Sequence, residues 1–453
     1  MEQITLKEIT DAVKGDLTNG DAEDTVSDVC IDTRNLSEGC LFIAIAGENF
    51  DGHDYIEKSF ELGAKVAISE KEIESSHPII KVKDTRKALM ELAKAYRKRF
   101  PIFLVGVTGS VGKTSTKEMI YAVLSQKYRT LETKGNLNNE IGLPMTLFNL
   151  DSTNEAAVIE MGMSNFGEIR RLSQTAQPSI GIITNIGVSH IENLGSRDAI
   201  LQAKLEIVDG LPEDAAMILN ADDDMLSIAH EYIGKDIIYY GVEEKDTIKA
   251  ENIKTENLTT TFDIVYYGKV IPAKIPTIGV HNVYNALAAF CVGIIADMSE
   301  EDIVAGLSRY KTAGMRQNIK KVNGITIIED CYNASPESMQ AAINVLGQLE
   351  TKGRRVAVLG DMLELGDYSS EMHNKVGGMT SKIKLDLLVC YGEQAQEIAN
   401  GAIKSGVVNV ASFSDADKVA SFVKGYIKEG DTILFKASRG MKLEQVIKMI
   451  NEE

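Results

Sequence analysis

The sequence predicts an α/β protein of three domains, and three observations support this. The chain has 453 residues, and at roughly 150 residues per domain that length favours about three domains. Apolar runs of strand length alternate with helical segments, which is typical of parallel sheets covered on both faces. A glycine-rich loop follows the first such run in the second quarter of the chain and opens a helix. We therefore expect at least one doubly wound sheet.

Residues 1–99 are expected to form a small α/β domain. Short strands are predicted at Gly39–Ile45, Lys65–Ser69 and Ile79–Val82, and a helix that ends at glycine at His53–Gly63. We find no phosphate-binding loop in this part of the sequence.

Residues 100–312 are expected to form a central domain around a parallel sheet. Phe103–Val107 is an apolar run before the glycine-rich loop, and the helix after the loop extends to about Gln126. Alternation over Leu258–Val270 predicts antiparallel strands at the sheet edge. Further strands or helices are predicted at Ala156–Met161, Ser179–Ile186, Arg197–Leu211, Ala216–Asn220, Ile237–Tyr240 and His281–Ala296.

Residues 313–453 are expected to form a second doubly wound domain. Its apolar runs are spaced by about one helix plus loops, the pattern of a Rossmann-like sheet. Ser335-Pro336 predicts a helix start, because serine caps helices and proline suits the first helical position. The predicted strands are Ile325–Ile328, Val356–Leu359, Leu385–Cys390, Val408–Ser412 and Thr432–Phe435.

The composition excludes a disordered chain. Hydrophobic residues make up 44% and charged residues 25% of the sequence, as in ordinary globular proteins. Since 48 Lys and Arg face 66 Asp and Glu, the net charge is -18. That balance argues against nucleic acid as a partner, because phosphate backbones require basic surfaces. It still permits a local basic pocket for a phosphate ligand.

The N-terminus and the cysteines favour a cytoplasmic protein. Met1–Asp11 is charged and lacks the apolar core of a secretory signal. The longest apolar runs, such as Ile180–Ile186, fall short of the roughly 18 residues of a membrane span. The cysteines form no C-x-x-C pair, so we expect reduced buried thiols rather than a zinc site or disulfides at Cys30, Cys40, Cys291, Cys331 and Cys390.

The strongest functional signal is the glycine-rich segment Gly106–Thr114. It lies between a strand and a helix, where backbone N–H groups and the helix N-terminus bind phosphate. Lys113 would reach the β- and γ-phosphates, and the Thr114 hydroxyl would ligate Mg²⁺. The common pattern requires glycine where this chain has Val107, so a turn that binds nothing is the alternative.

Three further residues are candidate metal or site residues. Glu160 ends a predicted strand, where nucleotide-binding sheets place a metal-binding acid, but a solvated strand end fits equally well. His190 follows another strand, although a lone histidine is usually structural. Lys204 has the pattern of an exposed helix lysine.

Motifs in all three parts resemble the Mur ligases, the ATP-dependent amide-forming enzymes of peptidoglycan precursor synthesis. The family loop T-G-S/T-x-G-K-T is similar to Thr108–Thr114, which accounts for Val107. The resemblance covers essentially the whole chain. Its other segments are Asp32–Arg34, Leu41–Gly47, Asp51–His53, Gly135–Pro144, Glu160–Met163, Asn185–His190, His281–Ala286, Glu329–Pro336 and Gly360–Gly366.

Within this family the chain looks most similar to the branch that ligates D-alanyl-D-alanine to UDP-MurNAc-tripeptide through an acyl phosphate. The resemblance implies ATP and Mg²⁺ as cofactors. We further expect a monomer without a nucleic-acid partner and without a membrane span. A branch that adds a single amino acid is one alternative, but its Asp-Asn-Pro-Arg motif does not occur in the sequence. Folylpolyglutamate synthases share the loop but not the N-terminal domain. A phosphate-loop ATPase module without ligation is the alternative from another class.

The resemblance also implies a role for each candidate residue. The ATP phosphates would contact Thr108, Gly109, Ser110, Val111, Gly112, Lys113 and Thr114. Magnesium would bind Thr114, Glu160, His190 and Lys204, the last as a carbamylated lysine. The remaining nucleotide contacts would be Asn282 at adenine, Arg316 at the γ-phosphate and Asp330 at the ribose or the magnesium shell.

The substrate contacts are implied in the same way. Asn138 and Asn139 would approach the acyl phosphate and the muramyl substrate, and Thr33 and Arg34 the uridine. Lys436, Ser438 and Arg439 would lie near the dipeptide. The candidate catalytic residues are Lys113, Asn138, His190, Lys204 and Arg316. The three domains would respectively bind the muramyl nucleotide, bind ATP, and deliver the dipeptide while closing on ATP.

Overall fold

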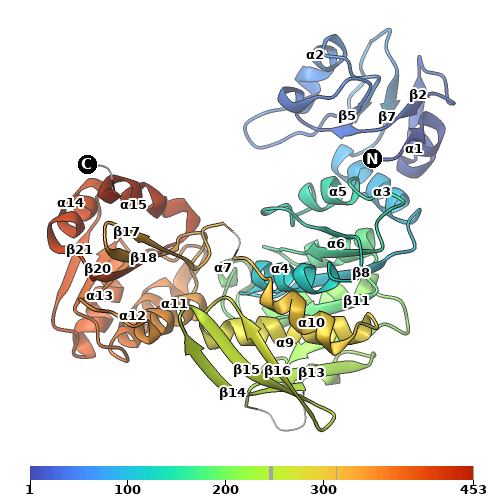
Figure 1. Ribbon diagram of the computed structural model, residues 1–453. Helices are drawn as coiled ribbons and strands as arrows, with labels where there is room; N and C mark the ends of the chain where they lie inside the picture. Colours follow the sequence, from blue (N-terminus) through green and yellow to red (C-terminus); the bar gives the residue numbers. More distant parts are fainter. Residues whose placement is uncertain (244–247, 313, 452–453) are drawn as a thin grey trace.

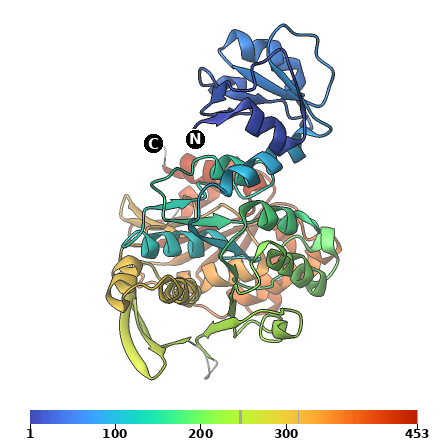
Figure 2. The same ribbon diagram turned by 90° about the vertical axis from the view of Figure 1, so that its right-hand side faces the viewer.

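The computed structural model describes residues 1–243, 248–312 and 314–451. Figure 1 shows three lobes that follow the sequence: an N-terminal lobe, a central lobe, and a C-terminal lobe beside the central one. Figure 2, turned by 90°, shows the N-terminal lobe standing above the other two. The α/β fold with three lobes confirms the predicted fold class.

The N-terminal lobe contains a five-stranded sheet in the order β2-β7-β6-β5-β4. The predicted helix His53–Gly63 is in fact a 3-10 turn at Gly52–Tyr55 followed by a short α2. Sequence analysis did not single out α1 and α3. The elements are β1 Ile4–Thr5, α1 Leu6–Val13, β2 Asp16–Thr18, β3 Thr25–Val26, β4 Val29–Cys30, β5 Leu41–Ile43, α2 Ile56–Glu61, β6 Val66–Ser69, β7 Ile79–Lys81 and α3 Thr85–Arg97.

Helix α3 joins this lobe to the next one. It contacts α1 on one side and the central helices α5 (Gly142–Leu147) and α6 (Glu168–Ala176) on the other. The buried Tyr96 hydroxyl donates a 2.6 Å hydrogen bond to the Leu150 carbonyl. The last helix of the N-terminal segment is therefore anchored in the central core.

The central lobe is built on a nine-stranded sheet in the order β16-β15-β14-β13-β12-β11-β8-β10-β9. Strands β8 to β14 run parallel, and β14 to β16 form the antiparallel edge that alternation predicted. The strands are β8 Phe103–Thr108, β9 Thr130–Glu132, β10 Ala156–Glu160, β11 Ile180–Ile183, β12 Met217–Asn220, β13 Ile237–Gly241, β14 Ile248–Glu256, β15 Thr259–Tyr266 and β16 Lys269–Ile275.

Strand β8 lies between β10 and β11. The next strands along the chain, β9 and β10, lie on one side of β8, and β11 and β12 lie on the other side. Ligands of open α/β sheets bind at such a switch point, outside the carboxyl ends of the strands. The phosphate loop follows β8 directly. The sheet order therefore brings the ends of β8, β10 and β11 together at one edge.

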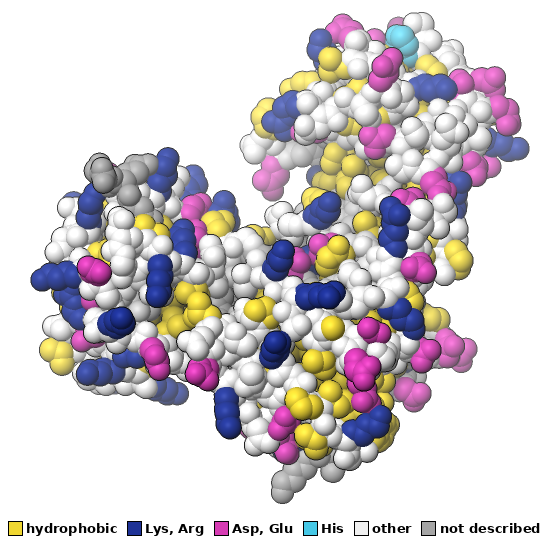
Figure 3. Space-filling view, viewed as in Figure 1, with side chains coloured by type: hydrophobic (Ala, Val, Ile, Leu, Met, Phe, Trp, Pro, Cys, Tyr) yellow, Lys and Arg dark blue, Asp and Glu magenta, His cyan; other side chains and the backbone are white. Residues whose placement is uncertain are grey.

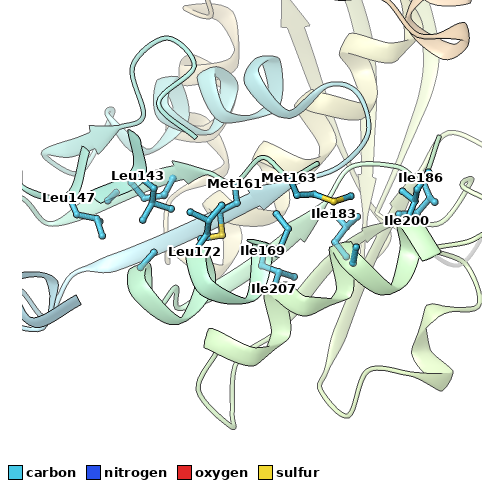
Figure 4. Close-up of a cluster of buried hydrophobic side chains, with 14 of the residues drawn as sticks. Leu143, Leu147, Met161, Met163, Ile169, Leu172, Ile183, Ile186, Ile200 and Ile207 are labelled. Carbon is cyan, nitrogen blue, oxygen red and sulfur yellow. The ribbon is translucent and has the colours of Figure 1, made fainter. Parts of the chain in front are cut away.

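Helices cover both faces of this sheet. Besides α5 and α6 they are α4 Lys113–Leu124, α7 Ile191–Leu194, α8 Arg197–Leu205, α9 Val280–Ile295 and α10 Glu300–Ser308. Leu104 of β8 packs with α5, α6 and α8 on one face, whereas Val105 and Val107 pack with α4, α9 and α10 on the other. Figure 4 shows side chains of the first cluster, among them Leu143 of α5, Ile169 of α6 and Ile200 of α8. Each such side chain stabilises the fold by about 1.5–3 kcal/mol.

The C-terminal lobe has a six-stranded sheet in the order β17-β18-β22-β19-β20-β21, parallel except for β17. Ser335 caps α11 and Pro336 is its first residue, as predicted. The elements are β17 Asn318–Val322, β18 Ile325–Asp330, α11 Pro336–Gln348, β19 Arg355–Gly360, α12 Ser369–Thr380, β20 Leu387–Tyr391, α13 Ala395–Lys404, β21 Val410–Phe413, α14 Ala416–Tyr426, β22 Thr432–Lys436 and α15 Leu443–Asn451.

Two expectations from composition agree with the fold. All five cysteines are buried and free of disulfide bonds. Within the described ranges, no helix is both long and apolar enough to cross a membrane. Residue 313, where the expected C-terminal domain begins, and residues 452–453, where it ends, lie outside the described residues.

Candidate active site

The phosphate loop has a backbone that only glycine allows at two positions. Gly109 has φ +148° and Gly112 has φ +83°. A Cβ on Gly109 would overlap the Thr184 hydroxyl. Helix α4 begins at Lys113, directly after Gly112, so its N-terminal N–H groups and partial positive charge face the loop.

The segment after β11 holds the loop in place. Thr184 Oγ1 donates a 2.6 Å hydrogen bond to the Val111 carbonyl. The Asn185 side chain accepts the Val111 N–H at 3.0 Å and donates to the same carbonyl at 2.9 Å. Gly187 N–H donates to Ser110 Oγ at 2.9 Å. The loop is thus preorganised by contacts from the neighbouring strand end.

The loop opens into a cavity of about 570 Å³ that lies between the central and C-terminal lobes. Figure 3 shows a notch between the N-terminal and C-terminal lobes, above the central lobe, and on the drawn face of the C-terminal lobe Lys and Arg are more frequent than Asp and Glu. The predicted residues on the cavity wall are Ser110, Val111, Gly112, Lys113, Thr114, Asn138, Asn139, Glu160, His190, Asn282, Arg316, Asp330 and Lys436. The cavity wall thus holds the cations Lys113, Arg316 and Lys436 together with the carboxylates Glu160, Glu168, Asp330 and Glu337.

Lys113 lies at the base of this cavity. Its Nζ donates to the carbonyls of Gly109 at 2.8 Å and Ser110 at 3.4 Å. Burial lowers the pKa of Lys113, an effect that Glu160 opposes and Arg316 reinforces. The three charged groups are therefore close enough to influence one another.

Glu160 is buried, with 1% of its surface exposed, so the alternative of a solvated strand end is wrong. Its Oε2 accepts a 2.9 Å hydrogen bond from the Thr114 hydroxyl, and its Oε1 accepts one of 2.7 Å from Asn138. A carboxylate and a hydroxyl beside a phosphate loop are the hard oxygen donors that magnesium prefers.

His190 lies just before α7 and lines the same cavity. Its Nδ1 is 2.7 Å from Glu364 Oε2, a contact between the central and C-terminal lobes. The contact is an ion pair whose angle departs from hydrogen-bond geometry. His190 holds the pKa of Glu364 below its ordinary value.

Lys204 lies on α8 and is only 1% exposed, so the interpretation as a surface lysine is wrong. Burial, reinforced by the charge of Lys113, lowers the pKa of Lys204 well below its usual range. Its side chain is not on the cavity wall. In the described part of the chain, no three His, Cys, Asp or Glu side chains converge as a metal cluster.

Two amide side chains of α9, Asn282 and Asn285, also line the cavity. Asn282 Nδ2 donates to the Ile278 carbonyl at 2.9 Å, to Thr277 Oγ1 at 3.2 Å and to Gln317 Oε1 at 2.9 Å. Asn285 accepts the Thr116 hydroxyl at 2.9 Å. The Asn282 amide is thus bound to a residue of the C-terminal segment.

The C-terminal wall carries two cations. The Arg316 guanidinium lies 4.0 Å from the centre of the Tyr332 ring, a cation–π contact that fixes its position. Lys436 Nζ is buried and donates to Asp330 Oδ2 at 2.7 Å and to the Asn333 carbonyl at 3.0 Å. Predicted ribose and dipeptide residues therefore contact each other.

Comparison with known families decides the assignment. Residues 25–97 match the model "Mur ligase family, catalytic domain", 107–293 match "Mur ligase middle domain", and 315–439 match "Mur ligase, glutamate ligase domain". The chain belongs to the Mur ligase family.

The Mur ligase is similar to named relatives over its full length. UDP-N-acetylmuramoyl-tripeptide–D-alanyl-D-alanine ligase of Bacillus subtilis is 43% identical, over 99% of this chain and 98% of the relative. The protein of the same name from Escherichia coli is 36% identical, over 100% and 99%.

Solved structures agree with these matches. A crystal structure of MurF from Acinetobacter baumannii has a TM-score of 0.94 at 32% identity and covers 100% of both chains. MurF from Thermotoga maritima in complex with ADP has a TM-score of 0.84 at 31% identity, over 94% of this chain and 97% of that one.

Some predicted residues of this Mur ligase lie away from the cavity wall. Thr108 and Gly109 do not line the cavity, and Thr108 is completely buried at the end of β8. Asn139 does line it, but its side chain also accepts the N–H groups of Ile141 and Gly142. It therefore caps the start of α5.

The predicted uridine residues, and the dipeptide residues other than Lys436, do not line the cavity. Thr33 and Arg34 form a 3-10 turn in the N-terminal lobe, where Arg34 pairs with Asp32 at 2.7 Å. Ser438 accepts the Leu363 N–H, and Arg439 pairs with Glu444 at the surface. The fold does not bring these residues onto the cavity wall.

Sequence analysis missed Gln317 and Glu337, which line the cavity, and Glu364, which contacts His190. Glu364 lies in Gly360–Gly366, a segment that the family resemblance already contained, so a signal existed. Gln317 directly follows Arg316, but no pattern distinguished it. Glu337 is a first-turn acid of α11, which by itself indicates only a favourable helix start.

Proposed function

We propose that this Mur ligase joins D-alanyl-D-alanine to UDP-MurNAc-tripeptide, with conversion of ATP to ADP and phosphate, in peptidoglycan precursor synthesis. The product is UDP-MurNAc-pentapeptide. The main support is the full-length similarity to relatives of that name. The phosphate loop and the cations around one cavity supply the chemistry that this reaction requires.

The reaction proceeds in two steps. The terminal carboxylate of the tripeptide attacks the γ-phosphorus of ATP, which gives an acyl phosphate and ADP. The amine of D-alanyl-D-alanine then attacks the acyl carbon, and phosphate leaves as the amide forms. The first step brings two anions together, so positive charge must offset their repulsion. Lys113 and Arg316 supply it from opposite sides of the cavity.

Thr114 and Glu160 would hold magnesium, with His190 as a further ligand. Their oxygens lie beside the phosphate loop, and Mg²⁺ commonly completes its shell with water and phosphate oxygens. When bound, the ion neutralises charge on the phosphates. Asn138 keeps the Glu160 carboxylate oriented through its 2.7 Å hydrogen bond.

Lys204 would act as a carbamate. Carbamylation requires a neutral amine, and the burial of Lys204 favours that form. In the described residues no carboxylate pairs with this lysine. The resulting carbamate would be an anion near Lys113 and could serve as a further oxygen ligand, as the family resemblance implies.

The three expected domains would divide the work. Residues 1–99 would bind the muramyl nucleotide through Thr33 and Arg34, and residues 100–312 would bind ATP. Residues 313–453 would bind the dipeptide near Lys436 and close on the nucleotide, which excludes water from the acyl phosphate. In that state Asn282 would contact adenine and Asp330 the ribose. The protein would work as a cytoplasmic monomer.

An ADP-release assay with UDP-MurNAc-tripeptide tests the proposal. D-alanyl-D-alanine is expected to stimulate ADP release, and single amino acids are not. Stimulation by a single amino acid alone would assign the chain to the other branch of the family. ADP release without any muramyl nucleotide would indicate an ATPase module instead.

A further inference from the structure

The segment that carries His190 is contacted by the C-terminal lobe at several points. Glu337 Oε1 accepts the Val188 N–H at 3.2 Å. The Tyr368 hydroxyl donates to the Gly195 carbonyl at 3.2 Å. Between these two contacts lies the ion pair of His190 with Glu364. The docked C-terminal lobe therefore adds contacts to a segment that the central lobe also holds through Ile186 and Gly187.

Both members of the ion pair have an unusual backbone. His190 has φ +64° and Glu364 has φ +63°, the left-handed region that residues other than glycine rarely adopt. Such strain persists where the surrounding structure over-determines it, and it clusters at functional sites. The two residues that contact each other across the lobes thus both adopt a left-handed backbone conformation.

The two nitrogens of the His190 ring have different surroundings. Nδ1 is buried against the Glu364 carboxylate. Nε2 makes no hydrogen bond to any residue that the structure describes, and His190 lines the cavity together with Thr114 and Glu160. One side of the ring is held, and the other is available to a ligand.

We propose that Glu364 is a positioning residue that orients His190 for magnesium when the C-terminal lobe docks. Metal-binding histidines usually have their second ring nitrogen held by a carboxylate or carbonyl, which fixes the tautomer and raises the basicity of the ligating nitrogen. Glu364 Oε2 lies 2.7 Å from Nδ1 and is placed to take this role from the other lobe, although the angle of the contact departs from hydrogen-bond geometry. The inference rests on the proposed function, because it takes His190 as a metal ligand.

Lobe docking and metal binding are then coupled through one side chain. When the lobes separate, His190 loses the carboxylate and its orientation. Magnesium–nucleotide affinity is therefore highest in the docked arrangement, in which Arg316 also lines the cavity. A purely structural ion pair would affect lobe docking without changing metal affinity once the lobes are docked.

Titration of the full-length protein with Mn²⁺ in the presence of ADP tests this directly, with free Mn²⁺ measured by electron paramagnetic resonance. Glu364→Ala is expected to weaken Mn²⁺ binding about 10–100-fold. Glu364→Gln keeps an acceptor oxygen and is expected to recover part of that loss. His190→Ala should weaken binding to a similar extent, and the double variant should lose little more than either single variant.

Tyr368→Phe is the matched control, because it removes a contact to the same segment without touching His190. Its Mn²⁺ affinity is expected to fall much less than that of Glu364→Ala, because weaker docking is then the only effect. Unchanged affinity in both Glu364 variants, or additive losses with His190→Ala, would overturn the proposal. If the parent protein ligates D-alanyl-D-alanine but Glu364→Ala binds Mn²⁺ as the parent does, the positioning role alone is refuted. If Mn²⁺ affinity depends on Glu364 but the parent protein does not ligate the dipeptide, the proposed function alone is refuted.

Discussion

The Asn138 amide donates a hydrogen bond of 2.7 Å to Glu160, so a residue of a loop orients the buried carboxylate at the end of β10. The other carboxylate oxygen accepts the Thr114 hydroxyl. The proposed metal acid is thus fixed from two sides. Its geometry depends on the loop as much as on the strand.

Asn138→Ala is therefore expected to lower magnesium affinity or activity about 10–100-fold, as with other residues that orient metal ligands. Asn138→Asp should be worse, since it places a second carboxylate beside Glu160. ADP release measured against magnesium concentration checks this. Asn149→Ala, at an exposed asparagine of the same region, is the control. An unaltered magnesium dependence in Asn138→Ala would contradict the assignment.

Arg316→Ala is expected to reduce kcat about 10²–10³-fold, the usual effect of removing a group that stabilises developing negative charge. The KM for the muramyl nucleotide should change little, because Arg316 faces the phosphate end of the cavity. Arg316→Lys should not restore activity, because lysine lacks the planar fork. Steady-state kinetics with Arg309→Ala as an exposed control measure this. A large rise in the muramyl KM would refute the role.

Lys204 is expected to carry a carbamate at neutral pH and to lose it in acid. Burial lowers the pKa of Lys204, so the reactive neutral amine is populated at higher pH and becomes protonated as the pH falls. ¹³C NMR with labelled bicarbonate should show a carbamate signal that is missing from Lys204→Gln and present in the exposed control Lys375→Gln. Equal signals in both variants would exclude modification at Lys204.

Arg34→Ala is expected to raise the KM for the muramyl nucleotide and leave that for ATP unchanged, because Arg34 lies in the N-terminal lobe away from the phosphate loop. Stability should hardly change, since exposed ion pairs contribute about 0–1 kcal/mol. Initial rates against each substrate, with Lys58→Ala in the same lobe as control, check this. Identical kinetics in both variants would place uridine elsewhere.

Gly109→Ala is expected to destabilise the phosphate loop by about 1–3 kcal/mol, because it forces a residue with a Cβ into a restricted conformation against Thr184. Gly234→Ala, where a Cβ meets nothing within 4 Å, should be neutral. Hydrogen exchange of the α4 amides measures the local effect. Faster exchange in both variants, or in neither, would show that the Thr184 contact is not the cause.

The sequence predicted the strands of the central and C-terminal sheets best, because strands buried on both faces appear as continuous apolar runs. The ends were less accurate: Ser179–Ile186 was expected, whereas β11 is Ile180–Ile183. Four predicted residues lie outside the strand, and two of them, Thr184 and Asn185, hold Val111. Helix α3 was not singled out, although Asp84 caps it, because its apolar positions are interspersed with charges.

Site residues that belong to one continuous sequence motif could be predicted. Residues that the fold brings together from distant segments could not. The phosphate loop followed from its glycines and its lysine. Nothing local indicated that α8 would turn Lys204 inward, since its neighbours include charged residues on the same helix. Gln317 and Glu337 contact residues of the central lobe. Such long-range contacts produce no periodic pattern in the sequence.

One stretch of backbone after β11 contacts both the phosphate loop and the C-terminal lobe, so it links nucleotide binding to lobe docking. Asn185 holds Val111 of the phosphate loop, and only three residues later Val188 binds Glu337 of the other lobe. Two equilibria joined in this way obey reciprocity: the factor by which docking strengthens nucleotide binding equals the factor by which nucleotide strengthens docking. A variant that loosens the lobe interface should therefore also appear as a weaker ATP binder.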